Sequence, residues 1–91
     1  MKAERLRLRS YIRLEADAEG SGGMMLDTQS GAICACNVSA WSTLKALKKG
    51  GDIETLAANL TKTFEVEPQV AEQDVQALIK ELQLMNFLEQ P

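Results

Sequence analysis

The fold is decided by residues 24–37, MMLDTQSGAICACN. The short apolar runs 24–26 and 32–36 have the length of strands, and the polar residues 27–31 between them are typical of a hairpin turn. Gly31 can adopt the positive φ that such a turn needs, and Asn37 suits the N-cap of a helix. The stretch therefore predicts a β-hairpin that leads directly into a helix.

An alternating segment precedes the hairpin. Residues 6–14 place Leu6, Leu8, Ile12 and Leu14 on one side and polar residues on the other. This period of two predicts a half-buried strand with one solvated face. Residues 16–23 are polar and rich in glycine, so we expect a mobile loop that joins this strand to the hairpin.

After Asn37 the apolar period changes from 2 to 3.6, which predicts three helices. The first ends at Lys48-Lys49 before Gly50, and the second is capped by Asp52. The apolar stripe of the second runs from Ile53 to Phe64, and the third extends from Pro68 to a C-cap at Asn86. Phe87-Leu88 then packs back or pairs as a short terminal strand.

The element order β-β-β-α-α-α predicts an α+β fold, a winged-helix-like three-stranded antiparallel sheet followed by three helices that cover one of its faces. A length of 91 residues suits a single domain over residues 1–91. No apolar run approaches the roughly 20 residues of a membrane span, so we expect a cytoplasmic protein. Cys34 and Cys36 are read as free thiols, and Trp41 as a core anchor.

The order and spacing of many residues resemble the PqqD-like family. The resemblance is carried by Met25-Leu26-Asp27, Gly31, Cys36-Asn37, Ala40, Trp41, Leu44, Leu47, Gly50, Ile53 and Leu60, then by Asp74-Val75, Leu78, Leu82 and Phe87-Leu88. It covers residues 24–90. Two residues depart from the family pattern: Cys36 stands in place of a usual leucine and Asn86 in place of a usual glycine. Cysteine is readily buried and asparagine tolerates left-handed backbone, so both departures fit.

The resemblance implies a stand-alone recognition element that binds the leader region of a ribosomally made precursor peptide. Such a protein delivers the peptide to a modifying enzyme, which is a leader protease, a cyclase or a radical SAM protein. The pathway is then peptide natural-product biosynthesis of the lasso-peptide or radical SAM type.

The expected binding mode is addition of the peptide as an extra strand at a sheet edge. Residues 31–36 hold no charge, lysine or proline that would repel a partner strand, and the third helix supplies a second wall. In that helix Val70, Ala77 and Leu84 recur at seven-residue spacing, either as the groove or as ordinary core. Asp74, Glu81 and Glu72 would favour basic residues in the peptide. The predicted peptide-binding residues are Gly31, Ala32, Ile33, Cys34, Ala35, Cys36, Val70, Asp74, Ala77, Leu78, Glu81 and Leu84.

A winged-helix nucleic-acid-binding regulator is the alternative, because it shares these elements. The second and third helices carry more acidic than basic residues, which disfavours it. The sequence has no histidine, no phosphate loop and no metal-ligand set, so we expect no catalytic residue and no cofactor. The row Arg5, Arg7, Arg9 and Arg13 is interpreted as a solvated face, although it could meet phosphate or an acidic enzyme. A bare edge can also pair with a second copy, which leaves a homodimer open.

Overall fold

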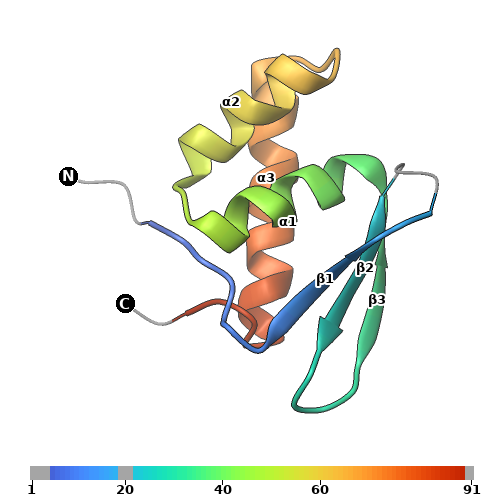
Figure 1. Cartoon of the computed structure of the whole chain (residues 1–91). Coiled ribbons are helices and arrows are strands. Elements are labelled where there is room, and N and C mark those ends of the chain that lie inside the picture. The colour runs from blue at the N-terminus through green and yellow to red at the C-terminus, as the bar shows by residue number, and fades with distance from the viewer. Residues whose placement is uncertain (1–4, 19–21, 90–91) are drawn as a thin grey trace.

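Three antiparallel strands precede three helices in the computed structural model, which describes residues 5–18 and 22–89 (Figure 1). The elements are β1 (Ile12–Ala16), β2 (Gly23–Asp27), β3 (Ile33–Cys36), α1 (Val38–Lys49), α2 (Ile53–Thr63) and α3 (Pro68–Leu84). The predicted α+β element order is therefore confirmed. Residues 19–21, which fall within the predicted mobile loop, lie outside the described residues.

The turn between β2 and β3 is held by the side chain of Asp27. Its carboxylate accepts hydrogen bonds from the Ser30 hydroxyl at 2.8 Å and from the Gln29 amide at 2.9 Å. These bonds, above all the one from Ser30, lower the pKa of Asp27. Gly31 has φ of 82° and donates its amide to the Asp27 carbonyl at 2.7 Å, so the predicted turn and the role of its glycine are confirmed.

The predicted strand over residues 6–14 is wrong in its extent, because the chain turns before β1. Leu6 and Leu8 form only single bridges, and the Ile12 amide donates to the Arg9 carbonyl at 3.0 Å in the turn. The burial pattern is nevertheless correct, since Leu6, Leu8 and Ile12 are all buried. Alternating burial alone does not distinguish a continuous strand from one broken by a turn.

A contact between the two ends of the chain accounts for this turn. The Arg9 guanidinium donates to the carbonyl and the Oδ1 of Asn86 at 2.9 and 2.8 Å, and the Tyr11 hydroxyl donates to the same carbonyl at 3.1 Å. Asn86 has φ of 63°, as expected of the residue that follows a helix C-cap. Leu8 then pairs with Leu88, so the predicted return of the C-terminal segment is confirmed.

The predicted starts of α1 and α2 are confirmed by their caps. Asn37 Oδ1 accepts from the Ala40 amide at 2.9 Å, and Asp52 Oδ1 accepts from the Thr55 amide at 2.8 Å. The Asp52 bond also lowers the pKa of that carboxyl. Phe64 was predicted inside the second helix but follows it in extended conformation and is half-buried.

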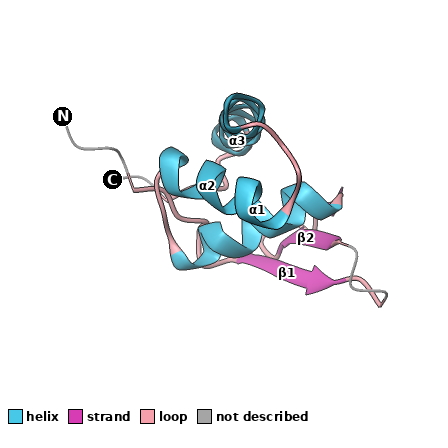
Figure 2. Ribbon diagram, turned by 90° about the horizontal axis from the view of Figure 1, so that it is seen from above, coloured by secondary structure: helices cyan, strands magenta, loops and turns pink. Residues whose placement is uncertain are grey.

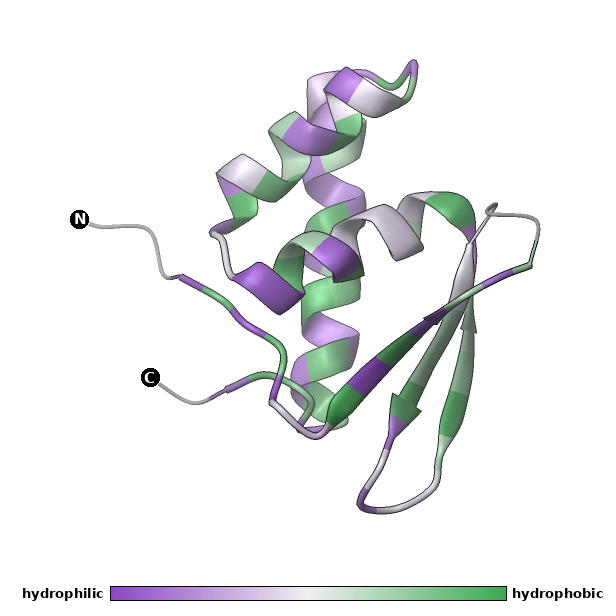
Figure 3. Cartoon of the chain, viewed as in Figure 1, coloured by the Kyte–Doolittle hydropathy of each residue, from purple (hydrophilic) through white to green (hydrophobic). Residues whose placement is uncertain are grey.

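Helix α1 lies between the sheet and α3 (Figure 2). Trp41 on α1 is buried, and its ring lies so close to Gly23 on β2 that a Cβ there would be 2.8 Å from it. The expectation that all three helices cover the sheet is wrong, because mainly α1 touches it while α2 packs on α3. Figure 3 shows apolar residues along β2 and β3, whereas hydrophilic and hydrophobic residues alternate in the segment before β1.

Of the helices described, none combines the length and the hydropathy that a membrane span needs.

Candidate functional site

The β3 strand lies at an edge of the sheet. The strand order is β1-β2-β3, and β3 pairs with β2 alone. Its other side therefore presents main-chain groups that no strand of the described chain takes up. This is the free edge that the sequence predicts.

Ile33 and Ala35 carry the free main-chain groups of this edge. The Asp27 amide donates to the Ala32 carbonyl at 2.9 Å, and Met25 lies opposite Cys34 in the register. Because antiparallel residues turn their hydrogen-bonding groups alternately toward and away from the neighbouring strand, Ile33 and Ala35 direct theirs outward. The edge offers two N–H groups and two carbonyls.

Gly31 and Ala32, which were predicted as part of the edge, belong to the turn. The Gly31 amide donates to Asp27, and the Ala32 amide donates to the Ser30 hydroxyl at 3.2 Å. Strand β3 begins only at Ile33. The structure therefore places these two residues in the turn that precedes β3, and their part in peptide binding stays a prediction.

The side chains of β3 divide between the two faces of the sheet. Ile33 is 60% exposed and Ala35 is also exposed, whereas Cys34 and Cys36 are half-buried against the core. Both cysteines are free thiols. Burial raises the pKa of the Cys36 thiol, so that thiol stays protonated near neutral pH.

A cavity of about 290 Å³ lies where the three helices meet beside the end of β3. It is lined by Asn37, Ser39, Ala40, Thr43, Leu60, Asp74, Ala77, Leu78 and Glu81. We call it the α3 pocket. Asn37 follows the last residue of β3, so the free edge leads toward the pocket.

Four residues predicted on the third helix line the α3 pocket together: Asp74, Ala77, Leu78 and Glu81. Val70 and Leu84 do not line it. They stand one heptad from Ala77, which is roughly 10 Å along a helix axis, and so lie beyond the pocket. Val70 is 44% exposed and Leu84 is 80% exposed, so the reading of this row as ordinary core is wrong.

The α1 side of the pocket was missed by sequence reasoning. Ser39, Ala40 and Thr43 are small and share one side of α1, and the Thr43 hydroxyl donates to the Ser39 carbonyl at 3.2 Å. Leu60 of α2 adds an apolar surface. A run of small residues on one helix face was the available signal, because it leaves room beside the helix.

The charged residues that line the pocket, Asp74 and Glu81, are both acidic. Asp74 and Glu81 are exposed carboxylates, and Glu72, the third predicted acid, does not line the pocket. Within residues 5–18 and 22–89 one ion pair is formed, between Arg13 and Glu15 at 2.7 Å. Neither Asp74 nor Glu81 is paired with a lysine or arginine among these residues. The pocket therefore favours a positively charged guest group.

The opposite edge of the sheet differs from β3. On β1 the ion pair of Arg13 and Glu15 stands beside the strand's outer residues. Charged side chains of this kind discourage further pairing at an edge.

Among the described residues, no group of three or more Cys, Asp or Glu side chains could hold a metal ion.

The fold and the site define a small α+β domain, winged-helix-like in its packing, with an uncharged open sheet edge beside a pocket. The chain belongs to the PqqD family: the family model for coenzyme PQQ synthesis protein D matches residues 22–88. This match confirms the resemblance drawn from residues 24–90. A search of curated protein sequences gave no significant match.

Three solved structures share the fold. A lasso peptide synthetase B1 complexed with its leader peptide is 29% identical, with a TM-score of 0.76, covering 93% of this chain and 98% of that one. TbiB1 in complex with the TbiA(beta) leader peptide is 14% identical, with a TM-score of 0.79 and coverage of 93% and 96%. The PqqD truncation of Methylobacterium extorquens PqqCD, a functional and stand-alone RiPP recognition element, is 21% identical, with a TM-score of 0.75 and coverage of 94% and 89%.

Proposed function

We propose that this protein binds the leader region of a ribosomally synthesised precursor peptide as an added strand on β3 and delivers it to a modifying enzyme. The observation that carries the proposal is the pair of outward-facing residues, Ile33 and Ala35, on an edge that leads to the α3 pocket. The lasso peptide synthetase B1 and TbiB1 were both solved with leader peptides, which supports the proposal.

Main-chain pairing cannot hold the leader by itself. Four hydrogen bonds at about 1 kcal/mol each contribute about 4 kcal/mol, and ordering an extended peptide opposes binding by about 2 to 5 kcal/mol. Micromolar affinity requires about 8 kcal/mol. Two or three apolar leader side chains, each contributing roughly 1.5 to 3 kcal/mol, must therefore be buried. The α3 pocket is the place for one of them, over Leu60 and Ala77.

A basic residue in the leader should lie near this anchor, because Asp74 and Glu81 stand at the pocket without a cation among the described residues. The same carboxylates disfavour the nucleic-acid alternative, since they would repel phosphate. The proposed role is recognition without catalysis, and the similarity to a stand-alone recognition element from Methylobacterium extorquens supports the recognition role. The partner enzyme is then a leader protease, a cyclase or a radical SAM protein, and the similarity to a lasso peptide synthetase B1 favours a lasso-peptide system.

Self-association would compete with this function. A second copy could pair with the same β3 edge, because edge groups do not distinguish one extended chain from another. The leader would then displace the second copy. Light scattering with and without the leader measures this competition.

The proposal is tested with Ala77→Arg and the synthetic leader of the precursor peptide encoded beside the gene. An arginine fills the α3 pocket from its exposed α3 side, so titration calorimetry should detect no binding. Gln83→Arg is the matched control, since it adds the same charge to α3 at an exposed position outside the pocket. Undiminished affinity in Ala77→Arg, with a folded protein by circular dichroism, would refute the pocket assignment.

A further inference from the structure

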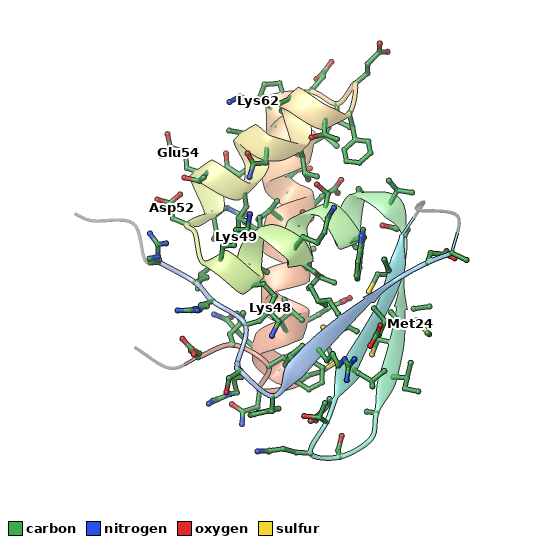
Figure 4. The ribbon with its side chains drawn as sticks, in the orientation of Figure 1. Met24, Lys48, Lys49, Asp52, Glu54 and Lys62 are labelled. Atoms are coloured by element: carbon green, nitrogen blue, oxygen red, sulfur yellow. The ribbon has the colours of Figure 1, made fainter. Side chains whose placement is uncertain are left out.

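The three lysines of α1 line a groove on the side of the protein away from the α3 pocket. A cavity of about 460 Å³ is lined by Leu14 of β1, by Lys45, Ala46, Lys48 and Lys49 of α1, and by Asn59 of α2. We call it the lysine groove. Figure 4 shows Lys48 on the side of α1 that faces β1 and Lys49 on the side that faces α2. No acidic residue lines it.

This arrangement is unfavourable for the helix alone. Lys45, Lys48 and Lys49 stand at i, i+3 and i+4, where like charges on one helix face repel each other. Lys48 and Lys49 also favour the last turn of α1 through the helix dipole, but Lys45 is too far from that end to contribute. The ion pair found in the described part of the chain involves none of the three. The helix therefore keeps a repulsive cluster that a negatively charged partner would relieve.

The groove also has an apolar part. Leu14 and Ala46 are half-buried and line it together with the three lysines. A bare phosphate would gain nothing from these two side chains, whereas an apolar side chain of a peptide would be removed from water there. Asp52 and Glu54 stand just beyond Lys49 (Figure 4), where they would repel a long polyanion such as duplex DNA.

We propose that the lysine groove binds an acidic segment of a partner protein, with carboxylates on Lys45, Lys48 and Lys49 and an apolar side chain over Leu14 and Ala46. The groove borders β1, whereas the leader site borders β3 at the opposite edge of the sheet. The two sites do not overlap, so both can be occupied at once. The inference rests on the groove alone and does not depend on leader binding.

The test is a chemical-shift titration of the ¹⁵N-labelled chain with a synthetic octapeptide of alternating glutamate and leucine. The expected result is that shifts gather at Leu14, Lys45, Lys48 and Asn59 and weaken when salt rises from about 20 to about 500 mM. A control octapeptide of alternating lysine and leucine should leave these amides unchanged. Shifts confined to β3 and α3, or none at all, would overturn the proposal.

Two charge-reversal variants separate the groove from net charge. Lys45→Glu with Lys48→Glu should weaken octapeptide binding at least about 10-fold, because two attractive contacts become repulsive. Lys62→Glu with Lys80→Glu makes the same charge change on exposed residues of α2 and α3 and should stay within about twofold of the parent. Equal weakening in both variants, or tighter binding of a 20-base-pair duplex at the groove amides, contradicts the assignment to an acidic protein segment.

Discussion

Proline at residue 35 tests strand addition directly. The N–H of Ala35 points away from β2, so its removal leaves the β2–β3 pairing intact. Proline is tolerated at outward positions of edge strands, and Cys34 before it already has the extended conformation that a residue preceding proline prefers. Ala35→Pro should therefore fold, with β3 closed to an added strand.

The loss of binding free energy can be worked from the edge groups. One N–H to carbonyl hydrogen bond disappears, at about 1 kcal/mol, and the leader carbonyl that met it is left unsatisfied, at about 1 to 3 kcal/mol. The total of about 2 to 4 kcal/mol corresponds to a rise in Kd of about 30- to 700-fold. The lower figure applies if water still reaches the leader carbonyl.

The assay is titration calorimetry of the leader peptide against Ala35→Pro and against Ala16→Pro. Ala16 ends β1 at the opposite edge. The Asp17 amide donates to the Gly22 carbonyl at 2.8 Å, so the groups of the preceding residue, Ala16, are directed outward. The control variant should bind within about twofold of the parent, as expected for a change outside the site. A folded Ala35→Pro that keeps the parental Kd would show that main-chain pairing at β3 is not used.

Two predictions concern stability. Asn86→Ala should lower the free energy of unfolding by about 1 to 2 kcal/mol, because a left-handed backbone strains alanine and the Arg9 bond to Oδ1 is lost. Asn86→Gly loses the same bond without the strain, so it should lower that free energy by less than about 1 kcal/mol. Equal losses for the two variants in urea titrations would contradict this. The lowered pKa of Asp27 means that its carboxylate stabilises the fold above about pH 4 and that this stabilisation is lost as the pH falls through the folded-state pKa. Asp27→Asn should therefore show a smaller drop in unfolding free energy between pH 7 and pH 3 than the parent does, and an equal drop would rule out Asp27 as a source.

The local elements were predictable because each is specified by neighbouring residues. Asn37, Asp52 and Gly31 determine caps and a turn through bonds to residues at most four positions away. The turn before β1 could not be foreseen in the same way. It depends on Arg9 reaching Asn86, which is 77 positions along the chain. Periodicity predicts burial, and it does not contain such distant contacts.

Only part of the candidate site could be predicted from the sequence. The free edge could, because β3 is the last strand of the sheet and carries no charged residue. The pocket did not, because its α1 wall exists only when α1 lies between the sheet and α3. A heptad row predicted Val70 and Leu84 as well as Ala77, yet a pocket of about 290 Å³ takes only the middle of that row. Helix periodicity predicts which residues lie on one face of α3, but it does not predict how many of them line the pocket.

An open edge that receives one peptide must also avoid receiving every other extended chain. The β3 strand has four residues, and its two outward residues supply a main-chain contribution that the ordering of a guest cancels. Under the proposed function, selection then has to come from the guest side chains that enter the α3 pocket, where Leu60 and Ala77 favour an apolar group and Asp74 and Glu81 favour a cation. A short edge beside an acidic pocket thus makes pairing conditional on the guest's sequence, whereas a longer β3 would bind extended chains with little discrimination.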